Sequence, residues 1–309
     1  MLHISFEGGL GNQMFQYAFA RYLQKQCLEP VQADISKYVV EANEIRNFEL
    51  KSFNISPSWK FESINSSRVR RLGGWKYLLY LAISAPYLSY NKRRVSRGLD
   101  PRFNDVYQEV INSFGYYRVH YGPYRISSNL SSKTKYIRGH WFSKEVVTSI
   151  SSIVRNELRV ITPISEDNQI TLKNIKSTNS VGVHIRRGDY VSLGMVVCDI
   201  DYYKYCMDQI SDKIDNPVYF IFSDDIEWVK QNLKTSHQLV YVDNNNTAPD
   251  DMRLLYSCKH FIMSNSTFSW WGAYLGNFAN KIVFAPRYWD QNRRKSSLLL
   301  DDWFDVENI

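Results

Sequence analysis

From Ser180 to about residue 285, short apolar runs alternate with helical patterns five times, and this alternation constrains the fold more than any other feature of the chain. Such alternation predicts an α/β fold with a doubly wound parallel sheet. The run Val-Tyr-Phe-Ile-Phe at 218–222 is apolar throughout, as expected of a strand that is buried on both faces. We expect strands at 181–185, 218–222, 239–242, 260–263 and 281–285, and helices at 201–214, 225–233, 250–258 and 268–276.

The beginning of the chain shows the same pattern once. Residues 3–6 predict a strand, the glycines that follow predict a tight turn, and apolar residues recur at helical spacing over 14–26. Residues 101–135 are polar with little periodicity, whereas 144–158 predicts a helix. The first half is therefore expected to hold a second α/β unit.

The length of 309 residues fits two domains of about 150 residues each. The segment 162–180 is rich in Ser, Thr and Asn and is expected to contain the connection between them. We place the domains at 1–160 and 161–309.

The positive charge of the chain is concentrated in one segment. Residues 60–100 hold nine Lys and Arg against two acidic residues, which accounts for the whole net charge of +7. The run at 77–88 within it is apolar and aromatic but too short to span a bilayer. Two interpretations are open: contact with an anionic membrane face, or a core helix with a solvated basic end. No nucleic-acid partner is expected, because the charge gathers in one segment and no nucleic-acid motif occurs.

The compartment can be inferred from the start of the chain and from its cysteines. No secretory signal is evident, since the first residues carry no basic region and run directly into Glu7 and glycines. Four cysteines are scattered without a C-x-x-C pair, which argues against a zinc site and against a disulfide framework. We expect a cytoplasmic protein.

Polar motifs follow three of the expected strands, and ligands of doubly wound sheets bind beyond the carboxyl ends of strands. The first motif reads His184-Ile185-Arg186-Arg187-Gly188-Asp189. Two adjacent arginines after a buried strand suit the paired, charge-assisted bonds of a diphosphate. The alternative is an Arg–Asp ion pair within a loop. His184 and Asp189 are candidates for a base, or for support of the loop.

The other two motifs follow the strands at 218–222 and 260–263. They read Phe222-Ser223-Asp224-Asp225 and Ser264-Asn265-Ser266-Thr267-Phe268-Ser269-Trp270-Trp271-Gly272. The two aspartates can hold ribose hydroxyls or a purine edge, bind a metal, or cap the next helix. The serine-rich run precedes a helix, whose free N–H groups bind anions, and it has more polar residues than a cap needs. Its tryptophans are expected to pack in the core.

A fourth motif, a glycine turn, opens the chain as Gly8-Gly9-Leu10-Gly11-Asn12-Gln13. Glycines after a first strand allow the backbone to approach a phosphate, although a plain strand-to-helix turn is equally compatible. The amides of Asn12 and Gln13 are expected to face a cleft. Together the motifs predict a nucleotide-diphosphate pocket, with the glycine turn on a facing domain.

In order and spacing, these four motifs resemble the α-1,2-fucosyltransferases of glycosyltransferase family 11, bacterial type. The resemblance covers nearly the whole chain, and the motifs at 184–189 and 264–272 are its specific part. It implies a GT-B fold of two facing Rossmann-like domains. The first domain, 1–160, would be on the acceptor side and the second, 161–309, would bind GDP-fucose. The last helix would pack back on the first domain.

The resemblance also implies roles for individual residues. Arg186 would stabilise the leaving diphosphate with Arg187 beside it, and Asn12 would lie near the transferred sugar. Inversion at fucose without a metal or another cofactor is implied. The candidate catalytic residues are Arg186, Asn12, His184 and Asp189, and the residues implied to bind the donor are Gly9, Gly11, Asn12, Gln13, His184, Arg186, Arg187, Ser223, Asp224, Asp225, Asn265, Ser266, Thr267 and Phe268.

The expected function is transfer of fucose to the 2-hydroxyl of a galactose-ended oligosaccharide or lipid-linked glycan, as in O-antigen synthesis. Bacterial members act on the cytoplasmic side, so residues 60–97 would contact the inner membrane peripherally. Two alternatives stay open: a non-catalytic protein that binds a nucleotide sugar, and a transferase that uses another nucleotide sugar.

Overall fold

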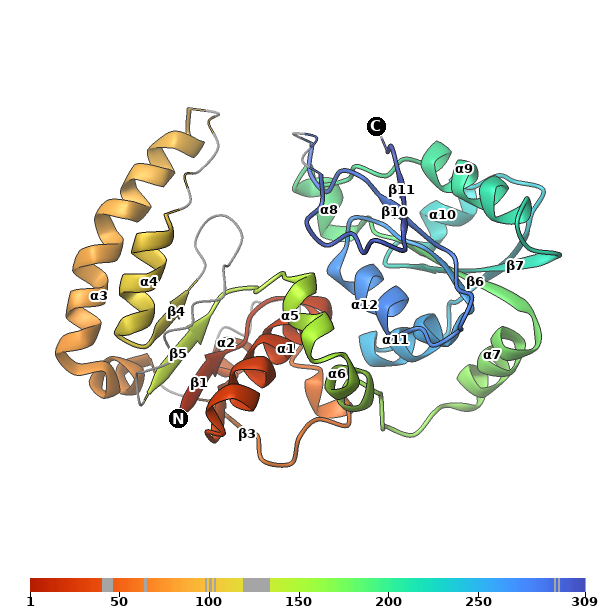
Figure 1. Ribbon diagram of the computed structural model, residues 1–309. Coiled ribbons are helices and arrows are strands. Elements are labelled where there is room, and N and C mark those ends of the chain that lie inside the picture. Colours follow the sequence, from red (N-terminus) through yellow and green to blue (C-terminus); the bar gives the residue numbers. More distant parts are fainter. Residues whose placement is uncertain are drawn as a thin grey trace. The chain divides into compact units, whose positions relative to one another are not determined.

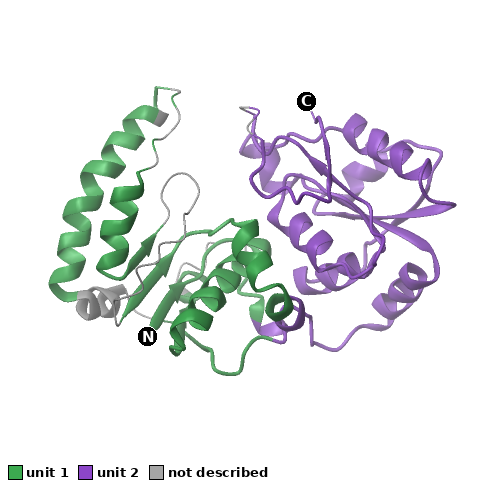
Figure 2. Ribbon diagram, viewed as in Figure 1, with its two compact units in different colours: residues 1–50, 55–154 green, residues 51–54, 155–309 purple. Residues whose placement is uncertain are grey.

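The computed structural model consists of two compact units, each built on a parallel sheet (Figures 1 and 2). Unit 1 comprises residues 1–50 and 55–154, and unit 2 comprises residues 51–54 and 155–309. The structure describes residues 1–40, 47–63, 66–97, 99, 102, 104–118, 134–291, 293 and 295–308, of which 40, 66–73 and 95 are described by their backbone alone.

The sheet of unit 1 has the strand order β3-β2-β1-β5-β4, and its four pairings are all parallel. Its strands are β1 (Leu2–Ser5), β2 (Val31–Asp34), β3 (Lys60–Glu62), β4 (Tyr116–Arg118) and β5 (Lys135–Arg138). Its helices are α1 (Leu10–Cys27), α2 (Ser36–Val40), α3 (Ser66–Val95), α4 (Asp105–Ser113) and α5 (Lys144–Ser149). Strands β2 and β3 lie on one side of β1, and the later strands β4 and β5 lie on the other. The switch point of this sheet therefore lies between β1 and β5.

Helix α1 begins earlier than the sequence predicts. Gly8 has φ +81°, and a Cβ at this position would lie 2.6 Å from Nδ2 of Asn12, so glycine is needed here. Gly9 is the N-cap, which places Gly11, Asn12 and Gln13 in the first helical turn. The turn is therefore shorter than expected, and the last four of the six residues of the glycine motif are helical.

Helix α3 packs one face against α4 and β4, beside which it runs (Figure 1). Tyr80, Tyr107 and Tyr116 form the centre of this contact, and the hydroxyl of Tyr107 donates to Oγ of Ser84 over 2.9 Å. The core-helix interpretation thus holds for this face. The other face of α3 carries exposed apolar side chains, namely Trp75, Leu78, Leu81 and Tyr90.

In the described part of the chain, no helix is both long and apolar enough to cross a membrane.

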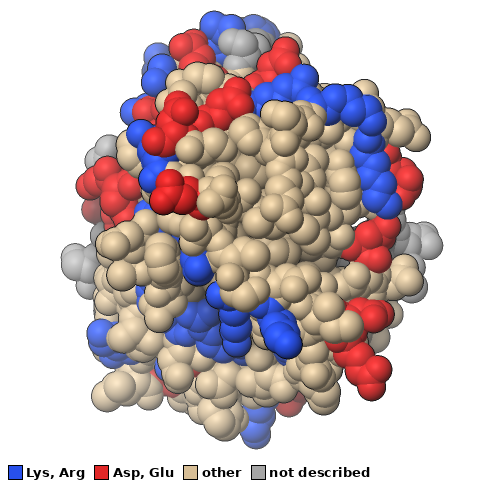
Figure 3. Space-filling model, turned by 90° about the vertical axis from the view of Figure 1, so that its right-hand side faces the viewer, with Lys and Arg blue, Asp and Glu red and all other residues tan. Residues whose placement is uncertain are grey.

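On the face of the molecule shown in Figure 3, basic and acidic side chains surround a broad uncharged area. Basic side chains form no continuous band across this face.

The sheet of unit 2 has the strand order β11-β10-β9-β6-β7-β8, again with all pairings parallel. Its strands are β6 (Asn179–Ile185), β7 (Pro217–Ser223), β8 (Gln238–Tyr241), β9 (His260–Ile262), β10 (Val283–Pro286) and β11 (Phe304–Val306). Its helices are α7 (Glu166–Ser177), α8 (Gly188–Ser192), α9 (Ile200–Ser211), α10 (Ile226–Asn232), α11 (Ala248–Ser257) and α12 (Thr267–Leu275), while α6 (Ser151–Glu157) begins in unit 1 and ends in unit 2. Counted within the unit, this is the Rossmann order, and its switch point lies between β6 and β9.

Two glycines let α11 and α12 pack closely on this sheet. A Cβ at Gly182 of β6 would lie 2.8 Å from Leu255 of α11, and one at Gly272 of α12 would lie 2.4 Å from the same side chain. Helix α12 is almost entirely buried, and Trp270 and Trp271 have no exposed surface. The prediction that both tryptophans pack in the core is confirmed.

A short segment of the first half belongs to unit 2. Phe53 is buried and forms an isolated antiparallel bridge with Val160. The backbone N–H of Asn54 donates to the carbonyl of Arg159 over 2.8 Å. The chain therefore passes from one unit to the other at 50/51, 54/55 and 154/155.

Several boundaries differ from the sequence expectations. The segment 162–180, expected to connect the domains, contains α7, which Ser165 caps by accepting from the N–H of Asn168. The units divide between Val154 and Arg155 rather than after residue 160. The helix expected at 144–158 is two helices, and the last described element is strand β11 of unit 2. The packing of the last helix on the first domain stays a prediction.

Candidate functional site

Three of the four motifs lie side by side at one edge of the sheet of unit 2 (Figure 1). They follow β7, β6 and β9, which are neighbours in that order and run parallel. The switch point between β6 and β9 is where open α/β sheets bind their ligands. The sequence prediction that these motifs meet is confirmed by the strand order.

His184 is buried at the switch point and connects two of its strands by hydrogen bonds. Its Nδ1 lies 2.6 Å from Oγ of Ser269 and 3.1 Å from Oγ of Ser264, so it ties the end of β6 to the turn after β9. Burial, helped by the nearby charge of Arg186, lowers the pKa of His184 to about 3. An imidazole that is neutral, buried and hydrogen-bonded in this way suits loop support better than proton abstraction.

Arg186 is held between two carboxylates. Its Nη2 lies 2.5 Å from Oδ1 of Asp189, and its Nη1 lies 2.6 Å from Oδ2 of Asp224. Its guanidinium also lies 5.2 Å from the ring centre of Tyr190. The ion pair that the sequence left as an alternative is therefore present. The two contacts engage two of the five N–H donors that a guanidinium carries, and the side chain stays partly exposed.

Arg187 is fixed by other partners. Its guanidinium carbon lies 3.3 Å from the ring centre of Trp228, and its Nε lies 3.3 Å from Oδ2 of Asp225. Its backbone N–H donates to Oδ1 of Asp224 over 2.8 Å. Stacking on Trp228 indicates that Arg187 shapes the loop beside Arg186.

The two adjacent aspartates, Asp224 and Asp225, have different contacts. Asp225 is the N-cap of α10 and accepts from the N–H of Trp228, while its own N–H donates to Oγ of Ser223. Asp224 instead bonds both arginines and packs against Gly188, where a Cβ would lie 2.3 Å from its Oδ2. The capping interpretation thus explains Asp225 but not Asp224. Contact of either residue with a nucleoside stays a prediction.

The serine-rich turn leads directly into α12. Ser266 caps the helix by accepting from the N–H of Phe268, and Thr267 is its first residue. Asn265 donates to the carbonyls of Met195 and Trp289, which fixes the loops on either side. Ser266 and Thr267 therefore stand at an oriented helix start, where N–H groups and the helix dipole favour an anion.

The glycine turn lies in unit 1, apart from these motifs in the topology. Gln13 is fully buried. Its side-chain amide donates hydrogen bonds to the carbonyls of Gly8 and Asn47 and accepts one from the N–H of Glu49. It therefore stabilises the turn, contrary to the expectation that its amide faces a cleft. Asn12, Gly9 and Gly11 line the start of α1, where contact with the donor stays a prediction.

Three residues of the site were not singled out from the sequence. Ser269 bonds His184, Tyr190 lies under Arg186, and Trp228 lies under Arg187. Ser269 lies inside the serine-rich motif and the other two lie close to a motif, but a ring or hydroxyl on a short helix gives no periodic signal. Only the position of Tyr190, four residues after Arg186, could have suggested its contact.

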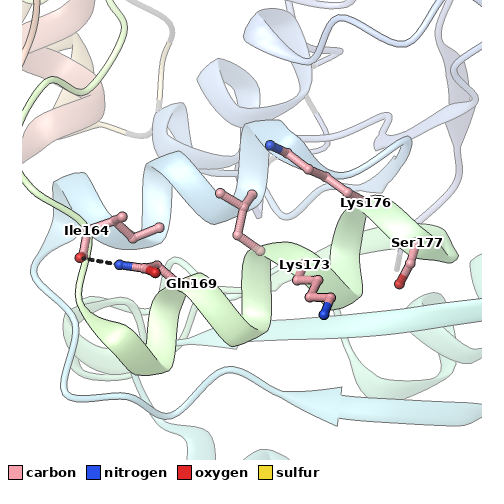
Figure 4. Close-up of a pocket in the computed structure, with 6 residues that line it drawn as sticks. Ile164, Gln169, Lys173, Lys176 and Ser177 are labelled. Atoms are coloured by element: carbon pink, nitrogen blue, oxygen red, sulfur yellow. Dashed lines mark hydrogen bonds between the residues drawn. The ribbon is translucent and has the colours of Figure 1, made fainter.

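One surface pocket of unit 2 lies along α7 and contains none of the motif residues (Figure 4). In it, Nε2 of Gln169 donates to the carbonyl of Ile164, and the side chains of Lys173 and Lys176 point in different directions. In the described chain, no three His, Cys, Asp or Glu side chains gather in a way that could hold a metal ion. The candidate site is therefore placed by topology and motif contacts.

Comparison with known proteins gives matches over the whole chain. The family model described as Glycosyl transferase family 11 matches residues 1–307. The O-antigen biosynthesis glycosyltransferase WbnK of Escherichia coli is 28% identical over 97% of this chain and 98% of its own. The α-1,2-colitosyltransferase of Escherichia coli is also 28% identical, over 97% of each chain. The galactoside α-(1,2)-fucosyltransferase 2 of Mus musculus is 25% identical over 66% of this chain and 65% of its own.

A solved structure shares the fold. The α-1,6-fucosyltransferase NodZ, in a crystal soaked with GDP-fucose, has a TM-score of 0.51 at 14% identity, covering 92% of this chain and 94% of that one. At this identity the likeness concerns the fold alone. With the two parallel sheets described above, it confirms the expected GT-B class with two Rossmann-like units.

Proposed function

This chain belongs to glycosyl transferase family 11, and on that premise we propose that it transfers fucose from GDP-fucose to the 2-hydroxyl of a galactose-ended acceptor, with inversion at fucose. The mouse relative is named for α-(1,2) transfer to galactosides. The observation that carries the proposal is the meeting of Arg186 and the start of α12 at the switch point of unit 2. This pair is suited to a diphosphate, which every GDP-sugar carries.

The proposed mechanism concerns the charge on the leaving group. Breaking the bond between fucose and phosphate places negative charge on GDP and positive charge on the sugar carbon. Asp189 and Asp224 hold the guanidinium of Arg186 before the reaction, and N–H groups at the start of α12 are oriented by the helix. Donors that are placed in advance lower the barrier without reorganisation. We propose that these groups stabilise GDP without a metal ion.

The test is release of GDP by the purified protein with GDP-fucose and galactose-ended oligosaccharides, in the presence of EDTA. We expect release that depends on the acceptor and is unchanged by EDTA, with a product carrying a 2-linked fucose. Tight binding of GDP-fucose without release for any acceptor would favour the non-catalytic alternative. Activity that EDTA abolishes and Mg²⁺ restores would refute metal independence alone.

A second candidate donor is favoured by one specific comparison. The colitosyltransferase is as similar to this chain as WbnK is. Colitose is a fucose without the 3-hydroxyl, so the two donors differ by one group on the sugar and share the same diphosphate chemistry. Competition between equal amounts of the two GDP-sugars distinguishes the two candidate donors. If more colitose than fucose is found in the product, colitose replaces fucose as the proposed sugar.

We propose that the outer face of α3 attaches the enzyme to the cytoplasmic side of the inner membrane, where a lipid-linked acceptor would be presented. Trp75 and Leu78 on this face are each 67% exposed. Lys92 and Arg93 follow on the same helix and are also exposed. Apolar rings and basic side chains on one exposed helix face suit an anionic bilayer surface. The name of WbnK, an O-antigen enzyme, agrees with such an acceptor.

Replacing Lys92 and Arg93 together by glutamine is expected to weaken binding to vesicles that contain anionic lipid by about 30-fold. Each basic side chain near such a surface contributes about 1 kcal/mol. The matched control replaces Lys173 and Lys176 of α7 by glutamine, which removes the same charge from another exposed helix. Equal weakening by both double variants in a sedimentation assay would reject α3 as the attachment face.

A further inference from the structure

The end of strand β1 carries a carboxylate that three basic groups surround. Oε2 of Glu7 lies 2.7 Å from Nζ of Lys37 and 3.8 Å from Nε of Arg138. Its Oε1 lies 3.8 Å from Nε2 of His140. Only the lysine is within hydrogen-bond distance, and the carboxylate and the imidazole lie close enough together for one hydroxyl group beside them to contact both.

This group lies where a ligand of unit 1 is expected. Glu7 follows β1, and Arg138 and His140 stand at and after the end of β5. These two strands are neighbours, and the switch point of the sheet lies between them. Lys37 comes from α2, which follows β2 on the other side of β1. The carboxyl ends of three adjacent strands thus supply the four side chains.

Aromatic rings extend the group on one side. The rings of His140 and Phe142 stack with centres 5.3 Å apart and planes 16° apart, and Phe142 is 38% exposed. Between them Trp141 has φ +58°, which is rare for a bulky residue, and its ring stacks on Phe19 of α1. The buried tryptophan therefore fixes the loop so that the two flanking rings lie together.

Folding stability does not account for this arrangement. Partly exposed ion pairs contribute little, and a left-handed Trp141 costs stability. Binding does account for it. An exposed ring face suits the C–H face of a sugar, and a carboxylate beside an imidazole suits its hydroxyls.

We propose that Glu7, His140 and Phe142 form a subsite for a neutral sugar ring of the acceptor, with one hydroxyl hydrogen-bonded to both the carboxylate and the imidazole. The inference rests on the proposed transfer, because it assigns the acceptor of that reaction to unit 1. Arg138 and Lys37 keep the carboxylate in place and add hydrogen-bond donors at its edge.

The charge states around the site agree with this role. Partial burial raises the pKa of Glu7, but the bond from Lys37 and the charges of Lys37, Arg138 and His140 outweigh it and lower the pKa overall. Glu7 is therefore an ionised acceptor at neutral pH. Partial burial lowers the pKa of His140 and Lys37 lowers it further, against the opposing effect of Glu7, so the imidazole is neutral there.

The test compares Glu7→Gln and His140→Phe with the wild-type protein, using the galactosides that the wild type fucosylates. The second variant keeps a ring for stacking on an exposed position, so it is expected to fold. For Glu7→Gln we expect the KM for the acceptor to rise about tenfold or more, the loss typical of a hydrogen bond to a charged group. For His140→Phe we expect a rise of about three- to tenfold, the loss typical of a hydrogen bond to a neutral group. The KM for GDP-fucose should change less than about threefold. Glu109→Gln on α4, an exposed site outside this group, is the control.

The outcomes separate this subsite from the proposed function. An unchanged acceptor KM in both variants, or an equal rise in the KM for GDP-fucose, would overturn the subsite while transfer stands. If the wild type transfers to none of the galactosides, the proposed function fails, and hydrogen exchange with lactose and N-acetyllactosamine decides on the subsite. Protection of residues 134–142 by these sugars would then support it, and unchanged exchange would reject it.

Discussion

Arg186→Ala is expected to lower turnover of GDP-fucose by about 10²–10³-fold, the usual cost of removing one donor that stabilises developing charge. Arg186 directly follows β6 at the switch point, and two carboxylates, those of Asp189 and Asp224, position its guanidinium. The KM for GDP-fucose should change less than turnover, because the charge on GDP grows only as the bond breaks. Steady-state kinetics with a saturating acceptor measure both constants.

Arg186→Lys serves as the matched variant. It keeps the positive charge but cannot contact two carboxylates with one planar fork, so we expect a smaller loss than with alanine. The melting temperature of both variants should stay within a few degrees of the wild type, because the ion pairs of Arg186 are partly exposed. Undiminished turnover in the alanine variant would remove Arg186 from the mechanism and leave the start of α12 as the stabilising group.

Gly188→Ala is expected to lower turnover by about 10²-fold although the glycine itself contacts no substrate. The added Cβ would lie 2.3 Å from Oδ2 of Asp224, so this carboxylate must move. The same oxygen holds Nη1 of Arg186, and the other oxygen of Asp224 holds the N–H of Arg187. A displacement of about 1 Å in a positioning group is enough for a loss of this size.

The control for Gly188→Ala is a crowded glycine whose added Cβ would meet apolar core atoms instead of a carboxylate of the site. Gly182 lies on β6, and a Cβ there would meet Leu255 at 2.8 Å. Gly182→Ala should therefore cost stability, about 1–3 kcal/mol as for other overpacked cores, while turnover of the folded protein is kept. We expect Gly188→Ala to lose turnover and Gly182→Ala to lose stability. Steady-state kinetics measure the turnover, and urea unfolding measures the stability. Full turnover in Gly188→Ala would show that the site tolerates movement of Asp224.

The second half of the chain could be predicted closely because its central strands, β6, β7, β9 and β10, are buried on both faces. The run at 218–222 is apolar throughout and became the centre of β7, and the alternation around it fixed the order of the elements. The motifs after β6, β7 and β9 could be grouped for the same reason, since parallel strands end at one edge.

The first half was harder because its elements are held by tertiary contacts. Helix α4 lies in the polar segment 101–135, where Tyr107 and Ile111 pack toward α3 and β4 and the polar Gln108 and Asn112 are buried beside them. One helix of the second half was missed as well: α7 lies in a segment rich in Ser, Thr and Asn, with Ile175 as its buried apolar residue. A helix like α7 has too few buried apolar residues for a periodic signal.

Individual roles within the site needed distances. The sequence suggested both an ion pair and a diphosphate contact for Arg186, and only the geometry revealed which acids hold it. Gln13 was expected to face a ligand, but its buried amide is used by Gly8, Asn47 and Glu49. A side-chain amide near a glycine turn satisfies the backbone as readily as it binds a substrate, and the two uses have the same sequence pattern.

The three crossings of the chain between the units have a genetic consequence. A gene divided at the 154/155 boundary would encode a second half without Phe53, the buried residue that bridges Val160 in unit 2. That half would therefore lack part of its own core, and the first half would carry four residues with no place to fold. Neither Rossmann-like unit can therefore be exchanged by a single cut in the gene. Recombination between relatives would preserve folding only if residues 51–54 were exchanged together with the second half.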